Sequence, residues 1–200
     1  MTHAIQHLRR NDPILARIID RVGEFAMRYR PADFDCLVRS IVYQQLSGRV
    51  ASVIFGRLEG AAGSPLTPEG ILRLRPARMR TLGLSAAKTA YIRDLARHTR
   101  ERRVVFEELP ALDDAEVIER LTQVKGIGTW TAHMFLMFAL RRPDVLPTGD
   151  LGIRNAIRKA YGLKELPAIA EIEAMAARWR PWCSVASWYL WRSLEGDANL

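Results

Sequence analysis

The chain has 200 residues, 48% of them hydrophobic, which suits one large or two small globular domains with a substantial core. No apolar run is long enough to cross a membrane, so we expect no membrane contact. The formal net charge is +8, and 26 of the 30 basic residues are arginine. This composition favours a nucleic acid partner, although a solvated arginine-rich surface would have the same composition.

Apolar residues recur at helical spacing along almost the whole chain, so we expect an all-α protein. Asn11-Asp12-Pro13 predicts a helix with a capped start and proline at its first position. Further helices are expected at about 34–42, 50–58, 67–74, 85–95, 113–121, 129–140, from 151, at 167–175 and from 181. The segment before Asn11, which holds His3 and His7, is expected to be loose.

The two cysteines, Cys36 and Cys183, lack the spacing of a metal site, and His98 and His133 are also far apart in the sequence. Two isolated cysteines fit a reducing compartment, and the N-terminus lacks the apolar core of a signal peptide. We therefore expect an intracellular, cytoplasmic protein without a metal bound by cysteine or histidine.

The most informative stretch runs from residue 121 to 150. Val124-Lys125-Gly126-Ile127-Gly128 has two glycines one residue apart, which lets the backbone turn tightly and approach a partner closely. The amides of such a turn, with the N-terminus of the helix that follows, form a site of the size of an anion. A phosphate group of a nucleic acid fits this site and the basic composition.

Asp150 follows about twenty residues later, at the expected start of the next helix. The commoner role of aspartate at this position is a plain N-cap. A carboxylate there, kept ionised by the helix N-terminus, can also take part in chemistry on a nucleic acid held by the glycine turn. The spacing after the glycine turn favours the catalytic interpretation, and Asp150 can serve in both roles.

These features together resemble the helix-hairpin-helix motif with a downstream Gly/Pro-rich loop and aspartate, as found in base-excision DNA glycosylases. Three segments resemble the 3-methyladenine DNA glycosylase II branch: Gly-Ile-Gly-Thr-Trp-Thr-Ala at 126–132, Gln-Gln-Leu-Ser at 44–47, and Arg-Trp-Arg-Pro-Trp at 178–182 followed by Trp191. The resemblance implies two helical lobes with the active-site cleft between them. We expect one lobe to combine residues 1–39 with 146–200, and a middle lobe, 40–145, to carry the hairpin.

The resemblance also assigns roles in DNA binding. The DNA backbone would be held by the hairpin residues Lys125, Gly126, Ile127, Gly128 and Thr129. A monovalent cation, Na⁺ or K⁺, would bind the main-chain carbonyls of Thr122, Val124 and Gly126, and no organic cofactor is expected. Gln45 would fill the space left by the flipped base; alternatively, Gln44 and Gln45 are only a polar pair at a helix end.

The target base would leave the duplex and stack in a pocket lined by aromatic rings. Trp191 matches the stacking tryptophan of the family, and its ring would attract a cationic alkylated purine. Trp182 and Tyr43 are further candidates for this pocket, with core packing as the alternative. Trp179 and Trp188 are expected in the core.

Trp130 stands where glycosylases that also cut the DNA strand have a lysine that forms a Schiff base, although Trp130 also fits the core of an apolar helix. The four-cysteine run of the iron–sulfur members is absent. The resemblance therefore implies a monofunctional hydrolase that removes alkylated purines such as 3-methyladenine from double-stranded DNA, as a nucleoid-associated monomer. Two alternatives remain: a non-catalytic helix-hairpin-helix module that only binds DNA, and a glycosylase for oxidised or deaminated bases.

Overall fold

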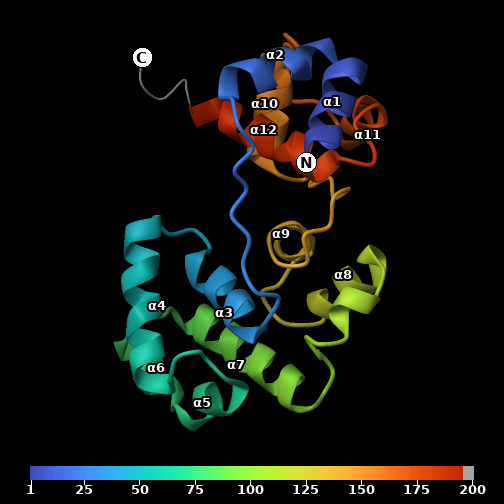
Figure 1. Ribbon diagram of the computed structural model, residues 1–200. Helices are drawn as coiled ribbons and strands as arrows, with labels where there is room; N and C mark the ends of the chain where they lie inside the picture. Colours follow the sequence, from blue (N-terminus) through green and yellow to red (C-terminus); the bar gives the residue numbers. More distant parts are fainter. Residues whose placement is uncertain (196–200) are drawn as a thin grey trace. The chain divides into compact units, whose positions relative to one another are not determined.

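Two compact units make up the computed structural model, which describes residues 1–195 (Figure 1). We call them the terminal unit, Met1–Tyr29 with the segment from Arg141 onward, and the middle unit, Arg30–Leu140. All regular elements of residues 1–195 are helices, as the apolar periodicity predicts. None of these helices is long and apolar enough to span a membrane.

The limits of the units differ from the expected lobe boundaries. The chain passes between units at residues 29/30 and 140/141, whereas the sequence led us to expect 39/40 and 145/146. Helix α3 (Phe34–Tyr43) runs unbroken across the first expected boundary and packs against helices of the middle unit. A boundary inside that helix would divide a single hydrogen-bonded element.

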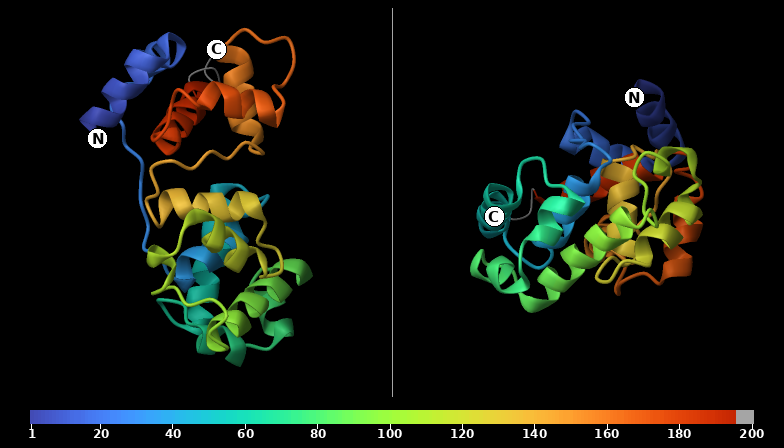
Figure 2. Two further views of the ribbon diagram at one scale, coloured as in Figure 1. Left: turned by 90° about the vertical axis from the view of Figure 1, so that its right-hand side faces the viewer. Right: turned by 90° about the horizontal axis from the view of Figure 1, so that it is seen from below.

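Five helices of the described residues form the terminal unit: α1 (Thr2–Asn11), α2 (Pro13–Val22), α10 (Leu151–Ala160), α11 (Ile169–Ala176) and α12 (Cys183–Glu195). Helix α12 packs against α1, α2 and α10, and the left-hand view of Figure 2 shows the blue N-terminal helices beside the red C-terminal one. Trp179 and Tyr189 are fully buried and Trp188 is nearly so. The core positions predicted for Trp179 and Trp188 are therefore confirmed.

Asp12 is a buried carboxylate that joins three parts of the terminal unit. As the N-cap of α2, its Oδ1 accepts the N–H groups of Ile14 and Leu15, each at 3.0 Å. Its Oδ2 accepts the Tyr161 hydroxyl and, at 2.8 Å, the indole N–H of Trp179. Burial alone would raise the pKa of Asp12, but these hydrogen bonds and the charge of Arg178 hold the pKa below its usual value.

The expectation of a loose N-terminal segment is wrong, because residues 2–11 form α1. Ala4 and Leu8, four positions apart on one face, are buried in the terminal unit. The ring of His3 lies edge-on to Trp182, with centroids 6.2 Å apart. Two buried positions in an otherwise polar segment are too few to give a clear sequence signal.

The middle unit contains α3, α4 (Gly48–Ala62), α5 (Pro68–Arg73), α6 (Pro76–Thr81), α7 (Ala86–Arg100), the 3₁₀ turn η1 (Leu109–Ala111), α8 (Asp114–Thr122) and α9 (Thr129–Phe138). Helix α7 packs against α3, α5 and α6, and α8 packs against α9 (Figure 1). Helix α7 therefore lies at the centre of this unit's contacts.

Short polar side chains start several helices where the sequence predicts. The Thr67 hydroxyl accepts the N–H of Gly70, and the Ser85 hydroxyl accepts that of Lys88. Asp113 and Glu116 form a reciprocal capping box at the start of α8, with bonds of 2.8 and 3.0 Å. The last helix begins at Cys183, two residues later than expected.

Candidate active site

The glycine-rich hairpin joins α8 to α9 in the middle unit. The N–H of Ile127 donates to the carbonyl of Val124 at 3.1 Å, which closes a tight turn. Gly126, the third residue of this turn, has a φ of +82°, and a Cβ there would collide with the ring of Tyr91 on α7. Conformation and close approach both require glycine at this position. Gly128 is exposed, and a Cβ on it would meet only open space.

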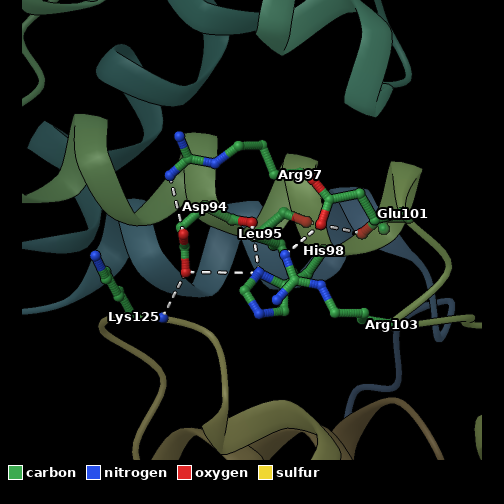
Figure 3. Close-up of polar contacts among 8 residues, drawn as sticks. Asp94, Leu95, Arg97, His98, Glu101, Arg103 and Lys125 are labelled. Atoms are coloured by element: carbon green, nitrogen blue, oxygen red, sulfur yellow. Dashed lines mark hydrogen bonds and ion pairs between the residues drawn. The ribbon is translucent and has the colours of Figure 1, made fainter.

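Two hairpin amides are already hydrogen-bonded within the protein. The N–H of Lys125 donates to Oδ2 of Asp94 at 3.0 Å (Figure 3), and that of Ile127 is used in the turn. The side chain of Lys125 is exposed, whereas that of Ile127 is buried. Helix α9 starts at Thr129, and the first amides of a helix have no carbonyl of a preceding turn to bind. If the hairpin binds an anion as predicted, its Gly128–Thr129 end and the Lys125 ammonium are the exposed groups available for it.

Asp94 on α7 holds the hairpin from inside the unit. Its Oδ1 accepts a bond from Arg97 at 3.0 Å, and its Oδ2 lies 3.6 Å from Nδ1 of His98 (Figure 3). Burial alone would raise the pKa of Asp94, but the bonds from the Lys125 N–H and Arg97 and the neighbouring positive charge hold the pKa below its usual value. The ionised carboxylate is thus the state that fits the hairpin.

The Gln44–Gln45 turn follows α3 and meets the hairpin. The side-chain amide of Gln44 donates to the carbonyl of Gly126 at 3.0 Å. Gln45 is exposed and has a φ of +56°, in the left-handed region that few non-glycine residues adopt. Lys88 on α7 donates from Nζ to the carbonyls of Val42 and Gln44, each at 2.7 Å. We expected the Gln44 side chain to bond to nearby backbone groups. It does bond to a backbone carbonyl, but that of Gly126 in the hairpin, so the bond joins the two turns.

A cavity of about 820 Å³ lies in the middle unit beside both turns. Four predicted site residues line it: Tyr43, Gln45, Gly126 and Gly128. Trp130 also lines it and is 47% exposed, so the alternative that Trp130 packs in the core is wrong. The wall therefore combines aromatic rings, amides and main chain.

Tyr43 contributes its ring and hydroxyl to that wall beside a fixed positive charge. The guanidinium of Arg39 donates to the Tyr43 hydroxyl and lies 4.2 Å from the centroid of its ring. The same guanidinium lies 5.0 Å from the ring centroid of Phe55. The hydrogen bond and the two cation–π contacts together favour this orientation of Arg39.

Asp150 lies in the terminal unit as the N-cap of α10. Its Oδ1 accepts the N–H of Ile153 and the indole N–H of Trp191, each at 2.8 Å. Asp150 and Trp191 are both half-buried. A Cβ on Gly152 would lie 2.9 Å from Oδ1 of Asp150 and 3.1 Å from Cδ1 of Trp191, so the indole can approach the carboxylate because this residue is glycine. The capping interpretation is correct, and the residue predicted to stack on the base binds the same carboxylate oxygen.

Trp182, the third candidate for base binding, immediately precedes α12. It is half-buried, unlike the fully buried Trp179, and contacts His3 edge-on. Its role toward a base stays a prediction.

Two of the three carbonyls expected to bind a monovalent cation already accept hydrogen bonds. The Val124 carbonyl accepts the Ile127 N–H, and the Gly126 carbonyl accepts the Gln44 amide. A carbonyl oxygen has two lone pairs, so each keeps one for a cation. Thr122 ends α8, where the last carbonyls lack helical partners. These oxygens are chemically able to bind the expected cation, which stays a prediction. Residues 1–195 contain no cluster of three or more His, Cys, Asp or Glu for another metal.

Sequence reasoning missed Lys88, Asp94 and Gly152. Lys88 and Asp94 lie on a helix whose apolar pattern accounts for the segment, and no local feature marks either as a contact of the turns. A signal existed for Gly152, because glycine inside a helix costs about 1 kcal/mol relative to alanine and needs a reason there.

Residues 38–182 match the family described as HhH-GPD superfamily base excision DNA repair protein. The chain belongs to this superfamily. DNA-3-methyladenine glycosylase 1 of Schizosaccharomyces pombe is 35% identical over 203 residues, covering 96% of this chain and 87% of that protein. YfjP of Bacillus subtilis is 35% identical over 169 residues, and the chain spans only 59% of its length. The solved structure of S. pombe Mag1 in complex with abasic DNA has a TM-score of 0.84 and 34% identity, covering 95% of each chain.

The HhH-GPD match confirms the resemblance inferred from the sequence and the all-helical fold that it implies. The hairpin and Asp150 lie inside the matched segment, whereas Trp191 lies beyond its end at residue 182. The roles of these individual residues stay predictions.

Proposed function

We propose that this HhH-GPD protein is a DNA glycosylase that hydrolyses the N-glycosidic bond of alkylated purines, such as 3-methyladenine, in double-stranded DNA. The reaction would start base excision repair. The name of the S. pombe relative and its complex with abasic DNA, the product of such a reaction, support this class of activity. In this chain the proposal rests on the Asp150 carboxylate, held by Ile153 and Trp191 at the start of α10.

Asp150 is the proposed catalytic carboxylate. As the base leaves with the electrons of the C1′–N bond, positive charge develops on the deoxyribose, and the carboxylate stabilises it. Water adds to C1′ and gives up a proton, which the carboxylate can accept. A purine alkylated at N3 or N7 is already cationic and needs little acid assistance to leave. The two hydrogen bonds to Oδ1 keep the carboxylate in one orientation while this happens.

The exposed turns of the middle unit are the proposed DNA contacts. Lys125 and the Gly128–Thr129 end of the hairpin bind the phosphate backbone without reading sequence. Gln45 enters the duplex in place of the flipped base. Trp191 stacks on that base, and Trp182 and Tyr43 are further candidates for contact with it.

A monovalent cation, Na⁺ or K⁺, is proposed at the carbonyls of Thr122, Val124 and Gly126. Its positive charge would favour a phosphate at the hairpin. Replacing both ions with tetramethylammonium at constant ionic strength should weaken binding to a duplex with an abasic-site analogue. Unchanged affinity would contradict the cation site.

The proposed enzyme is monofunctional and leaves an intact strand with an abasic site. The basis is Trp130, which cannot form a Schiff base at the position where strand-cutting relatives carry lysine. Borohydride should therefore trap no covalent enzyme–DNA complex. A trapped complex in good yield would overturn this part of the proposal.

The test of the function is base release from methylated duplex DNA, with the released bases identified by chromatography. The wild-type protein should release 3-methyladenine, and Asp150→Asn should lose release by several orders of magnitude. Asparagine also caps helices, so the fold should survive, and binding to an abasic-site analogue should persist. Near-normal turnover by Asp150→Asn would refute the catalytic role.

The rival function is a non-catalytic helix-hairpin-helix module that contacts the DNA backbone. Such a module would bind duplex DNA and release no base from any substrate. An oxidised-base glycosylase would instead release bases such as 8-oxoguanine and leave 3-methyladenine in place. The same assay on both kinds of DNA separates these outcomes.

A further inference from the structure

Lys88 makes an unusual pair of contacts at the end of α3. The last carbonyls of a helix lack partners within that helix, and a cation there is favoured by the helix dipole. Such a cation usually belongs to the helix's own last turn. Here it comes from α7, whose Lys88 Nζ reaches the carbonyls of Val42 and Gln44, each at 2.7 Å. A side chain 44 residues away from Gln44 thus fixes the backbone directly before Gln45.

The backbone at this point is in a conformation that needs support. Gln45 has a backbone φ of +56°, which residues other than glycine seldom adopt. Lys88 is half-buried, and burial lowers its pKa, because the charged ammonium loses part of its hydration. No carboxylate of residues 1–195 lies within ion-pair distance of Lys88. Its two carbonyl bonds are therefore the interactions that offset that loss.

One face of α7 contacts both turns. Lys88, Tyr91 and Asp94 follow one another at three-residue spacing, so their side chains share a face of the helix. Lys88 binds the Gln44–Gln45 turn, the ring of Tyr91 lies against Gly126, and Asp94 binds the Lys125 N–H (Figure 3).

The two turns are also joined directly. The Gln44 amide donates to the carbonyl of Gly126 at 3.0 Å. Lys88 binds the main-chain carbonyl of Gln44. A shift of the Gln44 backbone would therefore disturb the contact with the hairpin and the placement of Gln45 together.

We infer that Lys88 is a positioning residue, which acts from α7 through Gln44 to hold Gln45 in register with the hairpin. The inference rests on the proposed function, because Gln45 enters the duplex only if a base is flipped out of it. The role assigned to Lys88 is exerted through main-chain carbonyls and requires no contact with the reacting atoms or the DNA. It sets where the inserted amide lies relative to the backbone contact.

The decisive experiment is a double-mutant cycle of Lys88→Met and Gln45→Ala, with single-turnover excision of 3-methyladenine from duplex DNA as readout. Lys88→Met removes both carbonyl bonds and should slow excision between about tenfold and a hundredfold, as expected when a group is misplaced by about 1 Å. In the Gln45→Ala background the same change should cost several-fold less, because the side chain that Lys88 positions is already gone and only the disturbed hairpin contact remains. Equal losses in both backgrounds would show that Lys88 acts independently of Gln45, and would overturn the inference.

Three further variants support this experiment. Lys88→Arg keeps a cationic donor and should recover part of the rate. Lys164→Met, an exposed lysine of the terminal unit, is the matched control and should behave as wild type. Lys88→Gln replaces Lys88→Met in the cycle if thermal melting shows that the methionine variant does not fold.

Fluorescence separates this inference from the proposed function. 2-Aminopurine placed opposite an abasic-site analogue brightens when it is unstacked by an inserted side chain. Wild type should brighten it, and Lys88→Met should do so less at saturating protein. If wild-type protein releases no base at all, the proposed function fails, yet this optical difference still tests Lys88; equal signals would overturn the positioning role.

Discussion

The indole N–H of Trp191 and the main-chain N–H of Ile153 donate to the same carboxylate oxygen of Asp150, each at 2.8 Å. Trp191 therefore has two separable contributions at the scale of single residues. Its N–H orients the proposed catalytic carboxylate, and its ring is the proposed stacking surface for the base. The sequence suggested only the second of these.

Substitution of Trp191 should separate the two contributions. Trp191→Phe keeps a ring but loses a hydrogen bond to a charged group, worth roughly 1.5–3 kcal/mol, so excision should slow about tenfold to a hundredfold for every substrate. Trp191→Ala also loses stacking, roughly 1–3 kcal/mol more. That second loss should be at least as large for cationic 3-methyladenine as for a neutral base, because the charge–ring attraction is lost too.

Melting curves provide the control for the Trp191 variants. A half-buried ring leaves no closed cavity when removed, so stability should fall far less than the roughly 3–5 kcal/mol of a buried tryptophan. A large loss of stability with unchanged kinetics per folded molecule would place Trp191 in the core and leave the stacking residue unidentified.

Asp94 should make stability depend on pH in the acid range. Its pKa in the folded protein lies below the ordinary 3.8, so ionisation stabilises the fold. That contribution is complete above about pH 5 and is lost as the pH falls through the lowered pKa. Asp94→Asn should therefore be less stable than wild type at pH 7, by roughly 1–3 kcal/mol, and this difference should shrink at pH 3.

Urea unfolding at the two pH values measures this effect. Asp12 also has a lowered pKa, so wild type and Asp94→Asn will both lose some stability in acid, and the comparison between them isolates Asp94. Glu165→Gln, at an exposed loop position, is the control and should follow wild type. If the difference in unfolding free energy between wild type and Asp94→Asn is the same at pH 7 and pH 3, Asp94 does not stabilise the hairpin as an ionised carboxylate.

At the scale of elements, the hairpin shows how two glycines in one motif serve different purposes. Gly126 adopts a left-handed φ against the ring of Tyr91 and is required by the interior of the middle unit. Gly128 precedes α9 and has open space where a Cβ would stand, so the fold places no such demand on it. A close approach of the DNA backbone would explain glycine at this second position.

Alanine at each glycine should give opposite results. Gly126→Ala should lower stability by about 1–3 kcal/mol from the left-handed φ alone, with more from the collision with Tyr91. Gly128→Ala should melt as wild type does but bind an abasic-site duplex several-fold more weakly. Thermal melting paired with a binding titration measures both, and full affinity in Gly128→Ala would show that the DNA does not approach this residue.

At the scale of the whole molecule, the net charge of +8 and the 26 arginines favour DNA through release of its counterions. This attraction is independent of sequence, which suits the proposed removal of damaged bases from any stretch of DNA. Lys125 is an exposed hairpin cation that the proposal places at a phosphate.

The salt dependence of DNA binding measures how many phosphates the protein contacts. The logarithm of the binding constant should fall linearly with the logarithm of salt concentration, and Lys125→Gln should reduce that slope by about 0.9, the value for one phosphate. Lys164→Gln should leave the slope unchanged. Equal slopes for Lys125→Gln and wild type would remove Lys125 from the DNA contacts.

The sequence by itself determined the helices with strong apolar periods, several of their caps, the hairpin and the aspartate that follows it. These are local signals, in which one segment contains both the residue and its reason, as with Asp113 and Glu116 in their capping box. The tertiary structure alone decided that α7 supports two distant turns and that Trp191 binds Asp150. Those contacts join residues 31 to 44 positions apart, and nothing in the local pattern of a helix encodes which distant backbone its polar face will meet.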